Sequence, residues 1–238
     1  MISSASNPTL KLVRKLAQKR KRDELGLFVA EGEDLVAAAA AAGIEPVELL
    51  VAGETVEAEL LGAVSTLPHP ARAIGVYRAA DLPQAAREVT LALWRVTDPG
   101  NVGTLLRTAD AFGAAVALSA GSADPLGQKA LRASAGAIFR VPLLDWDIHW
   151  DAPTGRRVAL VAHGGEPIGS VGLTGPVTFV LGAERDGLPP EVLASCDAQA
   201  WIPIPGAAES LNVAAAGAVA LYERSRRPNL AANPPKKL

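Results

Sequence analysis

The chain has 238 residues, 49% of them hydrophobic and 20% charged, a composition that provides a sizeable core and excludes global disorder. Its one cysteine excludes an intrachain disulfide, and its three widely separated histidines show no metal-ligand spacing, so we expect no metal site. The net charge of −2 hides a segment, residues 1–22, with seven Lys or Arg and no acid, which is typical of a polyanion-binding surface or of a solvated helix face.

The N-terminal segment contains the residues of a helix start. Asn7 can cap a helix, and Pro8 suits its first position. The apolar residues that follow share one helical face. The opening residues lack the apolar run of a signal peptide, and the alanines at 37–42 are too few to span a membrane. We therefore expect a cytoplasmic protein that does not contact a membrane.

A small α/β domain is predicted over residues 1–80. Short apolar runs predict three strands, at residues 26–32, 46–52 and 73–79. An alanine-rich helix is expected at 34–42, and a linker near 79–89. Glu31, at the end of the first strand, is interpreted as a hydrogen-bonded loop acid rather than a catalytic one.

Residues 81–238 alternate more regularly and predict a second domain. Apolar runs predict five strands, at residues 90–96, 114–120, 156–165, 176–184 and 201–205. Helices are expected at 102–112 and from Val213 onward. Short connections between strands and helices indicate a parallel α/β sheet. Because ligands bind outside the carboxyl ends of such strands, the loops at those ends should hold the functional site.

Three polar segments occupy these loops. They read DPGNVGTLLRTADAFGA (98–114), LGAERDGLPPEV (181–192) and IPIPGAAESLNVAAAG (202–217). The second domain has no G-x-G-x-x-G after its first strand, no P-loop and no G-x-S-x-G elbow, which disfavours dinucleotide binding, NTP hydrolysis and serine-hydrolase chemistry. The order and spacing of the three segments, together with RASAG at 132–136, resemble the signature motifs of the SpoU (TrmH-type) branch of the SPOUT RNA methyltransferases.

The resemblance covers about Thr90–Glu223, and the N-terminal part is similar to the small substrate-binding domain of ribosomal-RNA members. It implies a SPOUT domain with a C-terminal trefoil knot and a homodimer. It also implies S-adenosylmethionine-dependent 2′-O-methylation of a ribose in RNA, with 23S-type ribosomal RNA as the expected substrate. A transfer-RNA ribose methyltransferase is one alternative. A non-catalytic RNA-binding protein on the same scaffold is another, although the intact polar positions of the motifs argue against it.

The first motif contains two of the expected catalytic residues. Asn101 stands at the start of its predicted helix and suits an N-cap. Gly103 and Arg107 share a helix face, and a bare glycine leaves room beside the arginine for a phosphate or a developing oxyanion. A surface ion pair with Asp110 is the alternative for Arg107. By resemblance, Arg107 is the catalytic arginine and Asn101 helps to place the ribose. A guanidinium pKa above ~12 favours charge stabilisation over a role as general base.

The other two motifs supply the remaining expected site residues. By resemblance, Glu184 holds the active-site loops, while Ser210 and Asn212 lock the last loop and cap the final helix. Three further residues match positions that contact the methyl donor: Gly182, Ile202 and Leu211, with Leu211 packed on the adenine. From the residues alone, Ser210 and Asn212 are helix caps and Glu184 is an acid at a helix start. A glycine at position 182 should let another molecule approach the backbone closely.

Apart from the expected site residues, the sequence gives three weaker expectations. The basic residues of the N-terminal segment are expected to hold RNA phosphates away from the reacting ribose: Lys11, Arg14, Lys15 and Lys19–Arg22. The four tryptophans are scattered in the sequence, so no base-stacking platform is expected. Gly217 should permit close packing of the final helix, at a dimer contact or within the knot.

Overall fold

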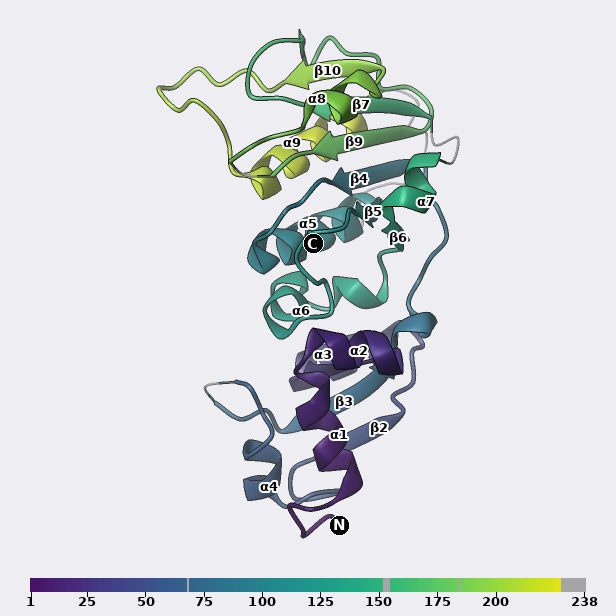
Figure 1. Cartoon of the computed structure of the whole chain (residues 1–238), viewed down its shortest axis with the longest axis vertical. Helices are drawn as coiled ribbons and strands as arrows, with labels where there is room; N and C mark the ends of the chain where they lie inside the picture. Colours follow the sequence, from purple (N-terminus) through teal and green to yellow (C-terminus); the bar gives the residue numbers. More distant parts are fainter. Residues whose placement is uncertain (68, 152–154, 184, 228–238) are drawn as a thin grey trace.

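Two regions lie one above the other along the long axis of the molecule (Figure 1). The structure is a computed structural model that describes residues 1–67, 69–151, 155–183 and 185–227. The N-terminal region, residues 1–81, contains a three-stranded sheet. The C-terminal region, residues 89–227, contains a seven-stranded sheet.

The N-terminal region contains the three strands and the helix that the sequence predicts. Its elements are α1 (Pro8–Leu16), α2 (Lys19–Leu25), β1 (Leu27–Glu31), α3 (Glu33–Ala41), β2 (Glu48–Val51), α4 (Ala58–Gly62), β3 (Ala73–Arg78) and the 3-10 turn η1 (Ala79–Asp81). The sheet has the order β1-β3-β2, and both neighbours run antiparallel to β3. At the start of α1, the Asn7 side chain accepts a hydrogen bond from the Thr9 N–H at 2.8 Å, so the predicted cap is confirmed.

The C-terminal region contains the predicted parallel sheet. Its elements are β4 (Val89–Leu93), α5 (Pro99–Phe112), β5 (Ala115–Leu118), α6 (Gln128–Ser134), η2 (Ala137–Phe139), β6 (Leu143–Asp145), α7 (Trp146–Asp151), β7 (Arg156–Leu160), β8 (Glu166–Pro167), β9 (Val177–Leu181), α8 (Pro190–Ala194), β10 (Ala198–Trp201) and α9 (Val213–Ser225). The order is β6-β5-β4-β9-β7-β10-β8, and neighbouring strands are parallel. The trefoil knot implied by the resemblance stays a prediction.

The last strand differs from its predicted position. Residues 201–205 were expected to form it, but β10 ends at Trp201. Pro203 and Pro205 have no N–H to donate to a neighbouring strand, so the segment that contains them leaves the sheet and becomes a loop. The short strands β6 and β8 are too brief to give a sequence pattern.

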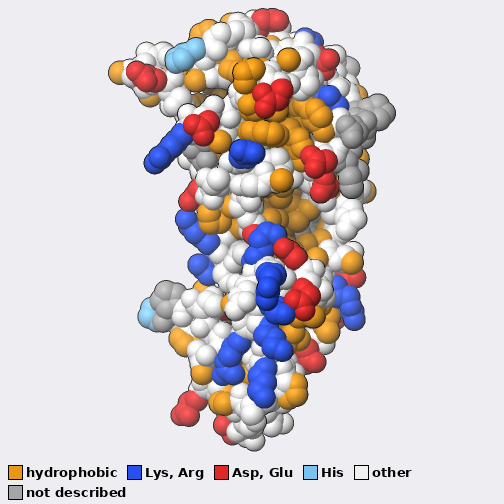
Figure 2. Space-filling view, in the orientation of Figure 1, with side chains coloured by type: hydrophobic (Ala, Val, Ile, Leu, Met, Phe, Trp, Pro, Cys, Tyr) orange, Lys and Arg blue, Asp and Glu red, His pale blue; other side chains and the backbone are white. Residues whose placement is uncertain are grey.

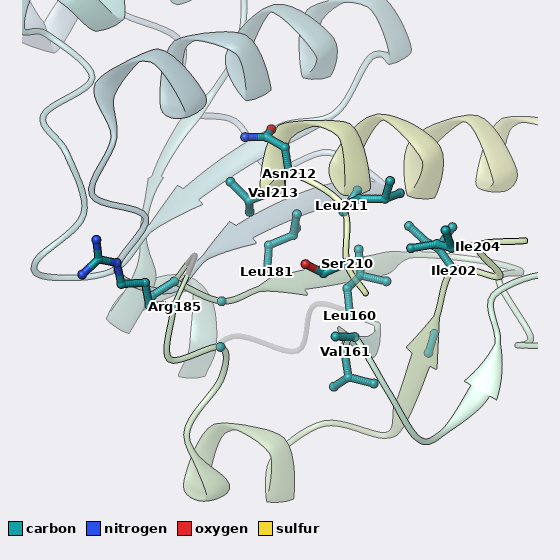
Figure 3. A pocket seen from close by; sticks show the side chains of 16 residues that line it. Leu160, Val161, Leu181, Arg185, Ile202, Ile204, Ser210, Leu211, Asn212 and Val213 are labelled. Carbon is teal, nitrogen blue, oxygen red and sulfur yellow. The ribbon is translucent and has the colours of Figure 1, made fainter. Parts of the chain in front are cut away.

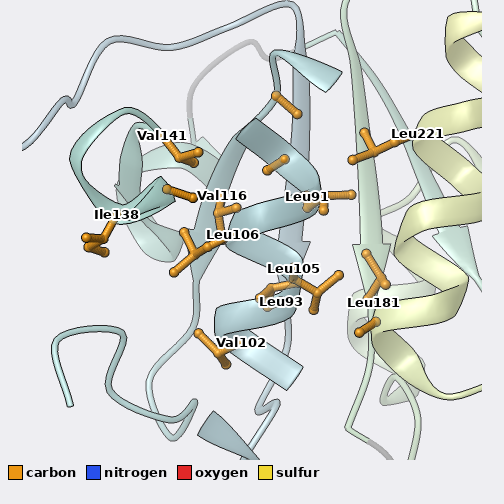
Figure 4. Packing of buried hydrophobic residues seen from close by; sticks show 14 of the residues in the cluster. Leu91, Leu93, Val102, Leu105, Leu106, Val116, Ile138, Val141, Leu181 and Leu221 are labelled. Carbon is orange, nitrogen blue, oxygen red and sulfur yellow. The ribbon is translucent and has the colours of Figure 1, made fainter. Parts of the chain in front are cut away.

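Helices α5 and α9 pack on one face of the large sheet. Leu105 of α5 lies among sheet residues that include Leu91 and Leu181 (Figure 4). A Cβ added to Gly217 of α9 would stand 2.4 Å from Leu105 Cδ2, so this glycine is what lets the two helices approach. The close packing expected at Gly217 is therefore present, and its partner is α5 of the same chain.

Three tryptophans gather on the opposite face of the sheet. Trp94 meets Trp146 edge-on at 5.3 Å between ring centroids, and Trp146 stacks on Trp150 at 4.6 Å. These three tryptophans, two of which are far from the third in the sequence, are thus neighbours in space. The helical spacing of 146 and 150, and the position of Trp94 just after β4, bring them together in space.

The two regions share one core. Phe28 of β1 and Tyr77 of β3 contact Phe139 of η2, with ring centroids 6.1 and 5.2 Å from that of Phe139. Gly136 lies against α3, since an added Cβ would stand 2.4 Å from Ala38 Cβ. The Gln128 side chain donates to the Val29 carbonyl at 2.8 Å. The boundary near residue 80 is thus a boundary in the sequence, whereas the packing is continuous across it.

Candidate functional site

A pocket of about 480 Å³ opens where three neighbouring strands of the large sheet end. It lies beyond the carboxyl ends of β7, β9 and β10, the position expected for a parallel sheet. The residues that line it are Leu160, Val161, Ala162, Leu181, Gly182, Ala183, Arg185, Gly187, Ala200, Ile202, Ile204, Ser210, Leu211, Asn212, Val213 and Ala216. The second and third motifs thus meet in one cavity.

The three residues expected to contact the methyl donor all line this pocket. Ile202 follows β10, and Leu211 precedes α9 on the other side of the same loop (Figure 3). Leu211 is 38% exposed, although it is a large apolar residue. An exposed leucine at the mouth of a cavity can pack on a flat apolar ligand.

Gly182 lines the pocket for a reason that the sequence did not indicate. An added Cβ would stand 2.3 Å from the carbonyl carbon of Gly187, because the loop after β9 folds back on itself. The Gly187 N–H donates to the Ala183 carbonyl at 3.0 Å, and Gly187 has a φ of +63°. The space left by the missing side chain is therefore filled by the chain's own turn, and the turn shapes one wall of the pocket.

Asn212 connects the third motif to the first. Its side-chain oxygen accepts from the Ala214 N–H at 2.9 Å and caps α9, as expected. Its amide nitrogen donates to Asn101 Oδ1 at 3.1 Å. Ser210 is directed into the pocket (Figure 3), so Asn212 provides the cap and the link to α5, while Ser210 contributes a hydroxyl to the cavity.

The start of α5 differs from the prediction. Asp98 is the N-cap, and its carboxylate accepts from the Asn101 N–H at 2.9 Å. The pKa of Asp98 lies below its ordinary value, mainly because Lys129 donates a hydrogen bond to its carboxylate. The hydrogen bond from the Asn101 N–H lowers the pKa further. Asn101 is therefore not the cap. It lies in the first turn of α5, where its side chain can reach Asn212.

The space beside Gly103 is also used differently. An added Cβ would stand 2.4 Å from the Ala130 carbonyl oxygen and 2.5 Å from Ala133 Cβ. Gly103 thus lets α6 pack closely on α5, and the expected room for a substrate phosphate is occupied by α6. RASAG supplies the small residues of this contact.

Arg107 lies on the outer face of α5. It is exposed and does not line the pocket of its own chain. The alternative ion pair with Asp110 is wrong, because Asp110 binds Arg140 through hydrogen bonds of 3.0 and 2.7 Å. Arg107 makes no hydrogen bond or ion pair with any residue that the structure describes. Its guanidinium is free to meet a ligand or a second chain.

Two further points complete the set of predicted site residues. Glu184 lies outside the described residues. Arg185, which follows it, lines the pocket and was missed, although its place inside the second motif is the signal that could have found it.

The basic residues of the N-terminal segment fall into two groups. Lys11, Arg14 and Lys15 are exposed on α1, and Figure 2 shows Lys and Arg side chains gathered over this end of the molecule. Arg22 differs, because it is 9% exposed and forms an ion pair with Asp124 of the C-terminal region. The prediction that Arg22 holds a phosphate is therefore wrong, since its guanidinium links the two regions.

The paired lysines of α2 differ from the bases of α1. Lys19 forms an ion pair with Asp23 at 2.7 Å, and Lys21 with Glu24 at 2.6 Å. Partial neutralisation by these acids weakens the attraction of the two lysines for a polyanion.

Among the described residues, no helix has the length and apolar character needed to cross a membrane. The His, Cys, Asp and Glu side chains of the described residues also form no group of three or more that could hold a metal ion.

The pocket suits S-adenosylmethionine in size and lining. Its volume of about 480 Å³ lies within the ~300–1,000 Å³ usual for small-molecule sites. Apolar side chains of Ile202, Leu211 and Val213 can enclose an adenine ring. The main chain just beyond β7 and β9 supplies N–H and C=O groups for its polar edge.

Residues 88–222 match the SpoU rRNA Methylase family, and residues 7–80 match the MRM3-like substrate binding domain. The chain is 30% identical to the Bacillus subtilis 23S rRNA (guanosine(2553)-2′-O)-methyltransferase RlmP, over 93% of this chain and 97% of that protein.

Solved structures give the same result. An AdoMet-bound rRNA methyltransferase from Sinorhizobium meliloti has a TM-score of 0.84 and 30% identity, covering 97% of this chain and 98% of that one. The SpoU methyltransferase AviRb from Streptomyces viridochromogenes, in complex with AdoMet, has a TM-score of 0.80 and 25% identity, covering 92% and 97% of the two chains. With its motifs gathered around a pocket at the carboxyl ends of a parallel sheet, the chain belongs to the SpoU rRNA methylase family.

Proposed function

We propose that this protein transfers a methyl group from S-adenosylmethionine to the 2′-oxygen of a ribose in ribosomal RNA. The observation that carries the proposal is the Asn212–Asn101 hydrogen bond of 3.1 Å, which joins the pocket-lining third motif to the first. A ribosomal-RNA substrate also implies a cytoplasmic enzyme. The relatives compared above are named for the same reaction or the same substrate.

The chain's own residues would hold both reactants. Bound S-adenosylmethionine would supply an electrophilic methyl group. Leu211 and Ile202 would enclose the adenine, and the turn at Gly182 would fix the main chain beside it. Asn101, held by Asn212, would orient the ribose. As the 2′-oxygen forms its bond to the methyl carbon, the bond from that carbon to the donor sulfur would break, S-adenosylhomocysteine would leave as a neutral thioether, and the 2′-hydroxyl proton would pass to water. Fixed positions of this kind lower the barrier by removing the entropy cost of alignment.

Arg107 would act on the RNA in a site built by two chains. It is exposed and does not line the pocket of its own chain, and we infer that it serves the pocket of a partner in a homodimer. Helices α5 and α9 also expose apolar residues that a partner could cover, since Phe112 of α5 is 37% exposed and Tyr222 of α9 is 56% exposed. Because a guanidinium keeps its proton, Arg107 would position a phosphate and stabilise negative charge on the 2′-oxygen.

The N-terminal region would hold RNA farther from the reaction. Lys11, Arg14 and Lys15 present exposed charge along α1, and Arg20 of α2 is exposed as well. Exposed bases contact phosphates without reading sequence. Residues 1–80 would thus act as the RNA substrate-binding domain and residues 81–238 as the methyltransferase domain. Transfer RNA is the alternative substrate.

The test combines a ligand-binding and an activity measurement. Calorimetry with S-adenosylhomocysteine should show binding to the wild-type protein, and Leu211→Asp should weaken that binding by at least about tenfold because it places a charge beside the adenine. Leu49→Asp is the matched control: Leu49 is 39% exposed, close to the 38% of Leu211, but it lies in the N-terminal sheet.

Radiolabelled methyl transfer to ribosomal RNA, followed by nucleoside analysis, should yield a 2′-O-methylated product. Absence of binding at millimolar ligand would overturn the cofactor site. A labelled base in place of a labelled ribose would overturn the reaction, and a product formed only on transfer RNA would favour the alternative substrate.

A further inference from the structure

Arg95 has a backbone conformation that its side chain disfavours. Its φ is +49°, and in the described part of the chain the only other non-glycine residue with positive φ is Ala135. Left-handed backbone crowds a Cβ, so glycine is the residue that fits such a position without strain. A bulky residue that keeps such a conformation often does so because its side chain has a function.

The surrounding turn holds this conformation firmly. Arg95 is the second residue after β4, and its N–H donates to Ser119 Oγ at 2.9 Å. On one side the Trp94 N–H donates to the Leu181 carbonyl at 2.8 Å, and Leu181 lines the pocket. On the other side the Ala123 N–H donates to the Val96 carbonyl at 2.8 Å. The strain is therefore stored in a rigid turn at the carboxyl edge of the sheet.

The Arg95 side chain is supported but carries no partner charge. Its stem lies against Gly121, where an added Cβ would stand 3.5 Å from Arg95 Cγ, and its guanidinium lies 5.5 Å from the Trp94 ring. The residue is exposed and forms no ion pair within the described residues. Asp98 and Asp124, the nearest acids along the adjoining loops, are bound by Lys129 and Arg22.

The position of Arg95 relates it to the reaction. Three loop residues and the first turn of α5 separate it from Asn101, which keeps the two Cα atoms within about 16 Å. Both stand at the edge of the sheet where the pocket opens. A supported, unpaired guanidinium at that distance suits an anion that belongs to the same substrate as the ribose.

Resting on the function proposed above, we propose that Arg95 binds a phosphodiester of the RNA strand next to the nucleotide that is methylated. The guanidinium of Arg95 lies over the Trp94 ring, which in turn contacts Trp146. Arg95 is a substrate-positioning residue: it holds the strand while Asn101 of the same chain and the arginine at position 107 of a partner chain act at the ribose.

Arg95→Gly is the informative variant because glycine keeps the φ of +49° without strain. The variant should fold with an unchanged or higher melting temperature and bind S-adenosylhomocysteine within twofold of wild type. Its RNA dissociation constant and KM should rise about tenfold, and the slope of log binding constant against log salt should fall by about 0.7 to 0.9, the contribution of one phosphate contact. Arg95→Lys should restore most of the salt slope.

Ala135→Gly is the matched control, since it relieves the other positive φ, +48°, without removing a charge. It should leave the RNA affinity and the salt slope unchanged. An Arg95→Gly protein with wild-type KM and salt slope would overturn the proposal. A smaller sedimentation coefficient with unchanged RNA affinity would overturn it too, by assigning Arg95 to a protein contact. The RNA dissociation constant and its salt slope are measured by filter binding, which needs no turnover. Failure of methyl transfer by the wild-type protein would therefore refute the proposed function, while the RNA affinities would still test Arg95.

Discussion

The two sheets of this molecule differ in where their strands end. In the N-terminal sheet, β1 and β2 run opposite to β3, so its loops are divided between two edges. In the C-terminal sheet, neighbouring strands are parallel, and the carboxyl ends of β7, β9 and β10 meet around one pocket. In the N-terminal sheet, a charged residue at the end of a strand has a structural role. Glu31 of β1 is buried and accepts three hydrogen bonds of 2.9 Å from Ser65 and Thr66, as the sequence predicted for a structural acid.

The difference shows that polar residues indicate a site best when they follow parallel strands. Basic residues are densest in the N-terminal region, yet Arg22 is used to join the two regions and Lys19 and Lys21 are paired. In the C-terminal region, by contrast, uncharged polar residues mark the site. Ser210 and Asn212 line the pocket, and Asn101 is hydrogen-bonded to Asn212 beside it.

The largest expected effect tests whether catalysis depends on the C-terminal region. Arg107→Ala should lower methyl transfer at saturating RNA and donor by about a hundredfold or more, with cofactor binding unchanged, because in the proposed site it removes the charge that stabilises the reacting 2′-oxygen. Single-turnover assays measure this. Arg107→Lys keeps the charge but loses the planar fork, and it should recover only part of the rate.

The same variant tests the shared site. Mixing Arg107→Ala with Leu211→Asp chains should restore activity if Arg107 serves the partner's pocket. Random exchange makes half of the dimers mixed, each with one intact site, so about a quarter of wild-type activity is expected. No recovery in a mixture that sedimentation shows to be exchanged would place both residues in one chain's site.

The second expected effect breaks the contact between the two regions. Phe139→Ala should lower the free energy of unfolding by about 3–5 kcal/mol, because it removes a buried ring that touches both Phe28 and Tyr77. Chemical denaturation measures the loss. A conservative Phe139→Leu change is the control and should cost less. Independent regions would instead unfold in two steps, with the N-terminal step unaffected.

The third expected effect is on RNA affinity. Replacing Lys11, Arg14 and Lys15 by Gln should raise the RNA dissociation constant about tenfold or more at physiological salt and flatten the salt dependence, with turnover at saturating RNA unchanged. The matched control replaces Lys19 and Lys21, whose charges are paired on the surface, and should have a smaller effect. Equal effects from both sets would show that pairing does not matter for this surface.

The smallest expected effect concerns Tyr77. Burial, with a smaller contribution from Glu45, raises the pKa of Tyr77 to about 12 from 10.0, so the unfolded chain loses this proton at a lower pH than the folded one. The stability due to this group is complete below pH 10 and is lost as the pH rises toward 12. Tyr77→Phe should remove that loss. Because the hydroxyl is buried without a hydrogen-bond partner among the described residues, the variant should be at least as stable at pH 7. Thermal unfolding at pH 7 and 10.5 measures both effects.

How far the sequence predicts this molecule depends on the range of each interaction. The cap at Asn7 and the strands around Phe28 and Leu91 follow from local patterns, and they are confirmed. The resemblance to the family implied that Gly182, Ile202 and Leu211 contact one ligand, and all three line the same pocket, where the ends of parallel strands meet.

Interactions between distant residues were beyond local patterns. The contact of Gly103 with α6 and the gathering of Trp94 with Trp146 depend on packing between elements that lie far apart in the chain. The cap at Asp98 is a different case, since Asp98, Pro99 and Asn101 lie within four residues and each can stand at a helix start. Only the backbone geometry distinguishes them.

The core shared by the two regions also limits how the protein can be recombined. Phe139 and Gly136 belong in sequence to the C-terminal region, but in space they pack against Phe28 and Ala38 of the N-terminal region. A chimaera that exchanges residues 1–81 alone would leave an aromatic ring facing a foreign sheet and would expose the apolar underside of the donor module. An engineered exchange of the N-terminal region therefore also has to preserve or redesign the contacts that Gly136 and Phe139 make with it.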